Sequence, residues 1–152
     1  MNSTAAMDIL LVEDNPDHAE LTRSALKKGG THRVVWVKDG QEALDFLHRQ
    51  GPWASHTGGS PSVILLDIGL PKVSGHEVLG SVKSNDRLRC IPVIMLSTSG
   101  DPDDVARSYH AGANSYVIKA LDFADFVGRV KAIKDYWVQT NVLPEAVAFA
   151  SA

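Results

Sequence analysis

Residues 7–17 read MDILLVEDNPD, a mostly apolar run followed at once by the start of a helix. An apolar run of this length is typical of a strand that is covered on both faces. Behind it, Asn15 is a good helix cap, Pro16 suits the first helical position, and Asp17 favours the positive end of the helix dipole. The stretch therefore predicts a βα unit, with Glu13 and Asp14 at the junction.

The same unit recurs along the chain. Further apolar runs predict strands at residues 34–37, 63–66, 93–96 and 116–118. A segment with helical periodicity and a capping residue follows each of them. We therefore expect an α/β protein of the (βα)5 type, in which a doubly wound five-stranded parallel sheet lies in a three-layer sandwich with helices on both faces.

The last helix has the clearest pattern. After a cap at Asp122, one face is expected to carry Phe123, Phe126, Val127, Val130, Ile133 and Trp137. Residues 51–61 are rich in Gly, Pro and Ser and predict a surface loop. Gly29 and Gly30 are expected to end the first helix. We expect one domain over residues 1–139 and a tail over residues 140–152.

Composition excludes several classes of protein. The chain has 152 residues, a formal net charge of -3 and 44% hydrophobic residues, which suits one globular domain. No global positive field is present to bind nucleic acid, and no apolar run is long enough to span a membrane. A single cysteine, Cys90, cannot form an internal disulfide, so we expect a cytoplasmic protein.

Polar side chains follow four of the predicted strands at their carboxyl ends, where open parallel sheets bind ligands. They are Glu13 and Asp14, Asp67, Ser97 with Thr98, and Lys119. If the first and third strands are neighbours, three carboxylates converge and repel unless a cation binds them. Oxygen ligands favour Mg²⁺, and the lysine and serine can bind a phosphoryl group, which Asp67 could then accept as an aspartyl phosphate.

Four segments resemble the receiver domain of two-component response regulators, over about residues 7–138. They are LLVEDN (10–15), ILLDIGLP (64–71), PVIMLST (92–98) and SYVIK (115–119). The resemblance implies a flavodoxin-like fold with strand order 2-1-3-4-5. It also implies a set of site residues: Asp67 as phosphoacceptor, Glu13 and Asp14 as the acidic pair that organises Mg²⁺, Gly69 as a carbonyl ligand of the metal, Lys119 as the family's lysine, and Ser97 and Tyr116 as switch residues.

Within that family the chain is similar to small single-domain regulators that partner bacterial phytochrome kinases. The similarity rests on the loop before the third strand, on Ala120 after the lysine where most receivers have proline, and on the tail segment YWVQTNVLP (136–144). It implies that a sensor histidine kinase, of the phytochrome type, donates a phosphoryl group from its phosphohistidine to Asp67. It further implies that this Mg²⁺-dependent phosphorylation switches protein contacts, including those of a homodimer.

Three alternatives come from other classes. A phosphohydrolase with an aspartate nucleophile would need a second aspartate two residues after Asp67, where the chain has Gly69, so we expect a protein that is not an enzyme. A dinucleotide-binding fold would need a G-x-G-x-x-G motif after the first strand, where the chain has acidic residues. A receiver-like scaffold that works without phosphorylation stays open as a minority interpretation.

Overall fold

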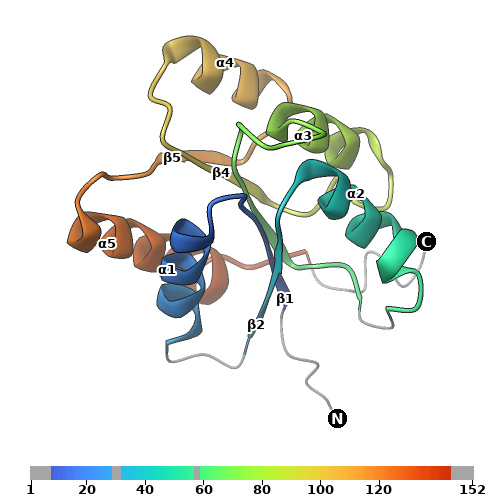
Figure 1. Ribbon diagram of the computed structural model, residues 1–152, viewed down its shortest axis with the longest axis horizontal. Helices are drawn as coiled ribbons and strands as arrows, with labels where there is room; N and C mark the ends of the chain where they lie inside the picture. The colour runs from blue at the N-terminus through green and yellow to red at the C-terminus, as the bar shows by residue number, and fades with distance from the viewer. Residues whose placement is uncertain (1–7, 29–31, 57–58, 145–152) are drawn as a thin grey trace.

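The computed structural model describes residues 8–28, 32–56 and 59–144, and it contains one open sheet between two layers of helices (Figure 1). The strands are β1 (Asp8–Val12), β2 (Arg33–Val37), β3 (Val63–Leu66), β4 (Val93–Ser97) and β5 (Ser115–Ile118). Each neighbouring pair is parallel, and the order is β2-β1-β3-β4-β5. The predicted (βα)5 fold and strand order 2-1-3-4-5 are confirmed.

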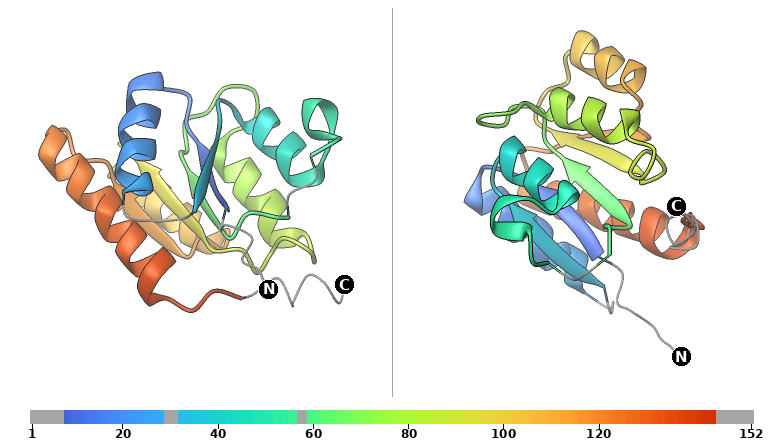
Figure 2. Two further views of the ribbon diagram at one scale, coloured as in Figure 1. Left: turned by 90° about the horizontal axis from the view of Figure 1, so that it is seen from below. Right: turned by 90° about the vertical axis from the view of Figure 1, so that its right-hand side faces the viewer.

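The helices cover both faces of this sheet. They are α1 (Pro16–Lys27), α2 (Gly40–His48), α3 (Gly75–Ser84), α4 (Pro102–His110) and α5 (Phe123–Ile133). Helices α1 and α5 pack on one face, while α2 and α3 pack on the other, as the view from below shows (Figure 2). Helix α4 lies on the α3 side, beside β5.

Alternate residues of the central strands enter two separate cores. In β1, Leu10 and Val12 join the core under α2 and α3, whereas Ile9 and Leu11 join the core under α1 and α5. All five residues of β1, four of β3 and five of β4 are buried. The edge strand β5 has no buried residue, because its outer side has no neighbouring strand. Continuous burial is therefore confirmed for the middle of the sheet.

Side-chain caps begin the helices where the sequence predicts them. The Asn15 side-chain oxygen, Oδ1, accepts from the backbone N–H groups of Asp17 and His18, and the Asp122 carboxylate accepts from the Asp125 N–H. Ser74 and Glu77 form a full capping box at α3. These caps satisfy backbone donors that would otherwise have no partner.

One expectation needs correction, and two others lie wholly or mostly outside the described residues. Phe123 does not join the buried face of α5: it is 63% exposed, and the buried residues of this helix begin one turn later at Phe126. Beyond Ile133 the chain continues as a π-helical turn (Lys134–Thr140) that still packs Trp137 on the core. The predicted stop at Gly29 and Gly30 and most of the tail, residues 145–152, lie outside the described residues.

The loop before β3 contains a short 3-10 turn (Gly51–Trp53), whose Trp53 ring packs edge-on against Phe46 with 4.9 Å between ring centroids. Over the residues that the structure describes, no helix is both long and apolar enough to cross a bilayer.

Gly75 allows α3 to start directly against the end of β3. A Cβ atom at this position would lie 1.9 Å from the carbonyl oxygen of Asp67, and the Gly75 N–H donates to the carbonyl of Ile68 at 2.8 Å. In the same helix, a Cβ atom at Gly80 would meet nothing within 4 Å. Only the first of these two glycines is therefore required by packing.

We expect Gly75→Ala to lower the free energy of unfolding by about 1–3 kcal/mol, because the added methyl group must displace the backbone at Asp67. The matched control, Gly80→Ala, is expected to raise it by about 0.5–1 kcal/mol, since alanine is the better residue inside a helix. Urea unfolding of both variants checks this. Equal stability of the two variants would contradict the close approach.

Candidate functional site

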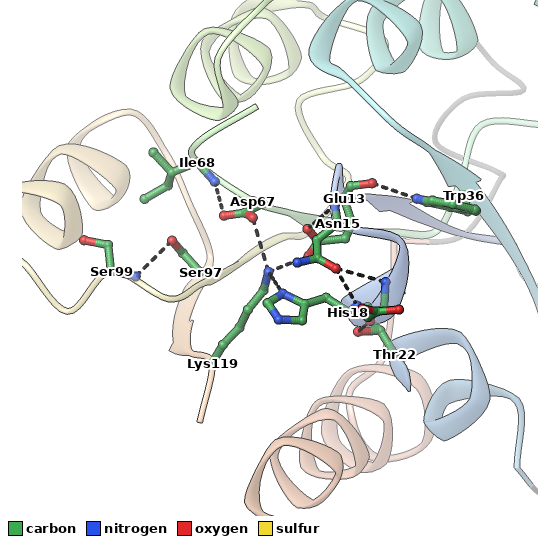
Figure 3. A network of polar contacts seen from close by, with 11 residues as sticks. Glu13, Asn15, His18, Thr22, Trp36, Asp67, Ile68, Ser97, Ser99 and Lys119 are labelled. Atoms are coloured by element: carbon green, nitrogen blue, oxygen red, sulfur yellow. Dashed lines mark hydrogen bonds and ion pairs between the residues drawn. The ribbon is translucent and has the colours of Figure 1, made fainter. Parts of the chain in front are cut away.

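The predicted polar residues gather at one edge of the sheet (Figure 3). Glu13 and Asp14 follow β1, Asp67 follows β3, Ser97 ends β4, and Lys119 follows β5. Because β1 pairs with β3 up to Val12 and Leu66, the residues after these two strands lie side by side. The Asp67 N–H donates to the Val12 carbonyl at 3.2 Å and continues this register into the site.

Three carboxylates converge there. Glu13, Asp14 and Asp67 each offer one oxygen, and these oxygens all lie within 4.8 Å of one another. Their environments differ: Glu13 is 2% exposed, the side chain of Asp67 is 14% exposed, and Asp14 lies at the exposed rim. The cluster therefore has a buried end and an end open to solvent.

Lys119 lies at the buried end, and its side chain is 2% exposed. Its Nζ atom lies 2.5 Å from Glu13 Oε1 and 3.2 Å from Asp67 Oδ2, so one ammonium group pairs with two carboxylates. Burial raises the pKa of the Glu13 carboxyl, while the hydrogen bond and the charge of Lys119 oppose that rise. The buried charge of the lysine is thereby paired, as a buried charge must be.

The residues fit a hard divalent cation. Three carboxylates and one ammonium leave two negative charges, which a divalent ion would neutralise, and carboxylate oxygens are the ligands such ions prefer. The cluster contains side-chain oxygens alone, so the carbonyl of Gly69 as a further ligand stays a prediction. Gly69 itself is exposed in the loop after Asp67.

Ser97 and Tyr116 meet at a third residue, Ser99. Ser97 is buried, and its Oγ accepts from the Ser99 N–H at 3.2 Å, while the Tyr116 hydroxyl donates to the Ser99 carbonyl at 2.8 Å. Burial raises the pKa of Tyr116, and hydrogen bonding to Ser97 and Ser99 opposes the rise. The structure thus links the two predicted switch residues through the loop that follows β4.

Two further residues belong to the site and were not predicted. His18, in the first turn of α1, lies with Nδ1 3.1 Å from Lys119 Nζ (Figure 3). The Trp36 indole N–H donates to the backbone carbonyl of Glu13 at 2.7 Å. Their positions carry a weak signal: His18 lies three residues after a helix cap that faces the site, and Trp36 lies near the carboxyl end of a strand beside β1.

The described residues contain no cis peptide bond, so the peptide between Lys119 and Ala120 is trans. With alanine instead of proline at this position, Lys119 still points into the site, where it contacts Glu13 and Asp67.

Comparison with known proteins gives one family and close relatives. A family model described as response regulator receiver domain matches residues 9–131. The chain is 47% identical over 140 residues to the probable methanogenesis regulatory protein FilR2 of Methanothrix harundinacea (strain 6Ac), with 90% of this chain and 86% of FilR2 covered. It is 39% identical over 139 residues to the response regulator Rcp1 of Synechocystis sp., with 91% of this chain and 93% of Rcp1 covered.

Solved structures agree with this result. This chain is similar to the crystal structure of the phosphorylated cyanobacterial phytochrome response regulator RcpA. The TM-score is 0.88 and the sequence identity is 40%, and the similarity covers 93% of this chain and 100% of RcpA. The Mn²⁺-bound form of Rcp1 is similar with a TM-score of 0.87 and 38% identity, covering 91% of this chain and 99% of that one.

We expect Asp14→Asn to weaken Mn²⁺ binding by at least about tenfold, because unit charges near a protein surface attract by about 4 kcal/mol at 4 Å. The matched control is Asp17→Asn, which removes the same charge from an exposed aspartate of the same segment that is not part of the cluster. Titration followed by electron paramagnetic resonance of free Mn²⁺ measures both affinities. Equal weakening by the two substitutions would show that only net charge matters.

Proposed function

This chain belongs to the response regulator receiver domain family, and from that premise we propose that Asp67 is the aspartate that accepts the phosphoryl group. Phosphoryl acceptance on an aspartate is the function of this family. One observation supports Asp67 above its neighbours. Asp67 belongs to the acidic cluster, pairs with the buried Lys119 ammonium and keeps an accessible side chain, and neither of the other two carboxylates combines all three properties. Glu13 is too buried for an incoming donor, and the lysine pairs with Glu13 and Asp67 rather than with Asp14.

The reaction is a transfer between two proteins. A carboxylate oxygen of Asp67 forms a bond to phosphorus as the bond between phosphorus and the imidazole nitrogen of the donor breaks, and the electron pair of that bond stays on the imidazole. Lys119 stabilises the charge on the transferred phosphoryl oxygens from the buried side of the site. A divalent cation bound by the carboxylates would supply the same stabilisation from the open side.

We assign Mg²⁺ as the resident cation of this site. The relative Rcp1 has been crystallised with Mn²⁺, and the acidic cluster of this chain offers hard oxygen ligands for a divalent ion. Mg²⁺ is held in proteins by one or two carboxylates together with phosphate oxygens, which is the donor set that the phosphorylated site would present.

The partner we propose is a sensor histidine kinase of the phytochrome type. A sensor histidine kinase as phosphoryl donor follows from the family. The phytochrome assignment is supported by RcpA, a cyanobacterial phytochrome response regulator that is similar over 93% of this chain. We also propose that a homodimer of this chain carries the output.

The output would pass through Ser97 and Tyr116. A phosphoryl group on Asp67 attracts the Ser97 hydroxyl, which at present accepts from the Ser99 N–H. Tyr116 is held by a bond to the carbonyl of the same Ser99, so movement of that loop changes the position favoured by the tyrosine ring. The surface formed by α4 and β5 then offers a different set of contacts.

Hydrolysis of small phosphate esters is the enzymatic alternative, and the site is poorly equipped for it. The position two residues after Asp67 is Gly69, where a phosphohydrolase of this kind carries its general acid. Receiver domains are in general signalling proteins without enzymatic turnover, and we propose the same for this chain.

We expect Asp67→Asn to reduce phosphoryl labelling to background, because the amide is not a nucleophile, while Asp86→Asn, a substitution of an aspartate that is 97% exposed, leaves it unchanged. The measurement is incubation with Mg²⁺ and a phytochrome-type histidine kinase that carries labelled phosphohistidine. The label on the chain should be stable in acid and labile in base. A label that persists in the Asp67→Asn variant would exclude this residue as the acceptor.

We expect Ser97→Ala to leave Asp67 as the acceptor but to shift the equilibrium of the Tyr116 switch by about fivefold, since one hydrogen bond contributes about 1 kcal/mol. The ring resonances of Tyr116 in nuclear magnetic resonance spectra, recorded with and without phosphorylation, report this equilibrium. Ser84→Ala serves as the control, because Ser84 lies at the exposed end of α3. Identical resonance changes in all three proteins would contradict the role of Ser97.

A further inference from the structure

We propose that His18 is a positioning residue for phosphoryl uptake, and that its Nδ1 atom holds the ammonium group of Lys119 between Glu13 and Asp67. This inference rests on the proposed function, since it concerns how Lys119 is aimed at the acceptor Asp67. The contact that carries it is the 3.1 Å separation of His18 Nδ1 and Lys119 Nζ, a distance within the range of a hydrogen bond (Figure 3).

The third proton of the ammonium group needs this acceptor. An ammonium group has three protons, and a buried one that lacks a partner is costly. Glu13 Oε1 accepts one proton at 2.5 Å and Asp67 Oδ2 accepts another at 3.2 Å. His18 Nδ1 takes the third, so the three contacts together define the direction in which Nζ points.

His18 is itself held in place from three sides. Its backbone N–H donates to the Asn15 side chain at 3.2 Å, and its carbonyl accepts from the Thr22 hydroxyl at 2.7 Å. Its ring packs against Phe126 of α5 with 5.6 Å between centroids. The ring contact places the imidazole between α1 and α5, and the two backbone contacts hold the helical turn from which the side chain projects.

A neutral acceptor suits this position better than a third carboxylate. A further negative charge beside Lys119 would compete with the incoming phosphoryl group for the ammonium. It would also repel the phosphoryl group. An imidazole nitrogen orients the ammonium without adding charge. Because Lys119 can only donate, Nδ1 must be unprotonated and the imidazole proton must lie on Nε2.

The contact also survives the change at Asp67. When a phosphoryl group is attached, the ammonium proton now directed at Asp67 Oδ2 can be donated to a phosphoryl oxygen. Glu13 and His18 remain as the two contacts that keep Nζ aimed at the acceptor. Loss of the His18 contact would therefore slow the transfer itself and leave recognition of the donor largely unaffected.

Two substitutions of similar shape separate this role from packing. In His18→Asn the side-chain oxygen is as many bonds from Cα as Nδ1 is in histidine, so an acceptor is kept. His18→Leu branches at the same carbon but has no acceptor. Both variants lose the ring contact with Phe126. Uptake from acetyl phosphate in excess Mg²⁺ is measured over a range of donor concentrations. We expect His18→Leu to lower the maximal rate on the order of tenfold, the effect of one hydrogen bond to a charged group, at an unchanged half-saturating concentration.

We expect His18→Asn to retain most of the wild-type rate. Equal slowing of both variants, or no slowing of either, would overturn the inference. In the wild-type protein, ¹⁵N spectra of the histidine side chains should show His18 protonated on Nε2, and protonation on Nδ1 would overturn it as well. If the wild-type chain takes up no phosphoryl group from either acetyl phosphate or the histidine kinase, the proposed function fails; if it does and His18→Leu is equally fast, only the role of His18 fails.

Discussion

The buried ion pair between Lys119 and Glu13 is the interaction on which the site depends. Both side chains are 2% exposed, so neither charge has water to solvate it, and each requires the other. The pair fixes the end of β5 against the end of β1, across β3 and β4. Asp67, which follows β3, lies between these two ends and is therefore placed beside the ammonium by the order of the strands. The local charge balance thus follows from the topology of the sheet.

A continuous set of hydrogen bonds leads from this site to the contact between α3 and α4. It runs from Ser97 through Ser99, Asp104 and Ser108 to His76, and Tyr116 joins it as a branch at Ser99. At its end, the buried His76 of α3 contacts the Ser108 hydroxyl of α4 at 2.9 Å, and burial lowers the pKa of this imidazole. A displaced β4–α4 loop must break these contacts or carry them with it, and the contact between α3 and α4 is the last of them.

Much of this arrangement could be predicted from the sequence, because parallel strands with buried faces leave a strong apolar signal. The bounds of β3 were predicted without error, and the acidic cluster followed from the single assumption that β1 and β3 are neighbours. Phe123 was predicted wrongly because helical periodicity does not reveal where the supporting sheet ends. His18 gave only the weak signal of its position after a helix cap, because one histidine in a first helical turn acquires a role only when Lys119, 101 residues later, lies against it.

Glu13 and Lys119 lie far apart along the chain, and this separation affects how the site forms during synthesis. Lys119 emerges from the ribosome 106 residues after Glu13, and among the described residues β5 is the last strand and an edge of the sheet. Contacts of such long range form slowly, because the intervening chain must first be ordered. An unfinished polypeptide therefore holds the acidic residues without their counter-charge. The charge balance of the site is therefore established only after Lys119 has been synthesised.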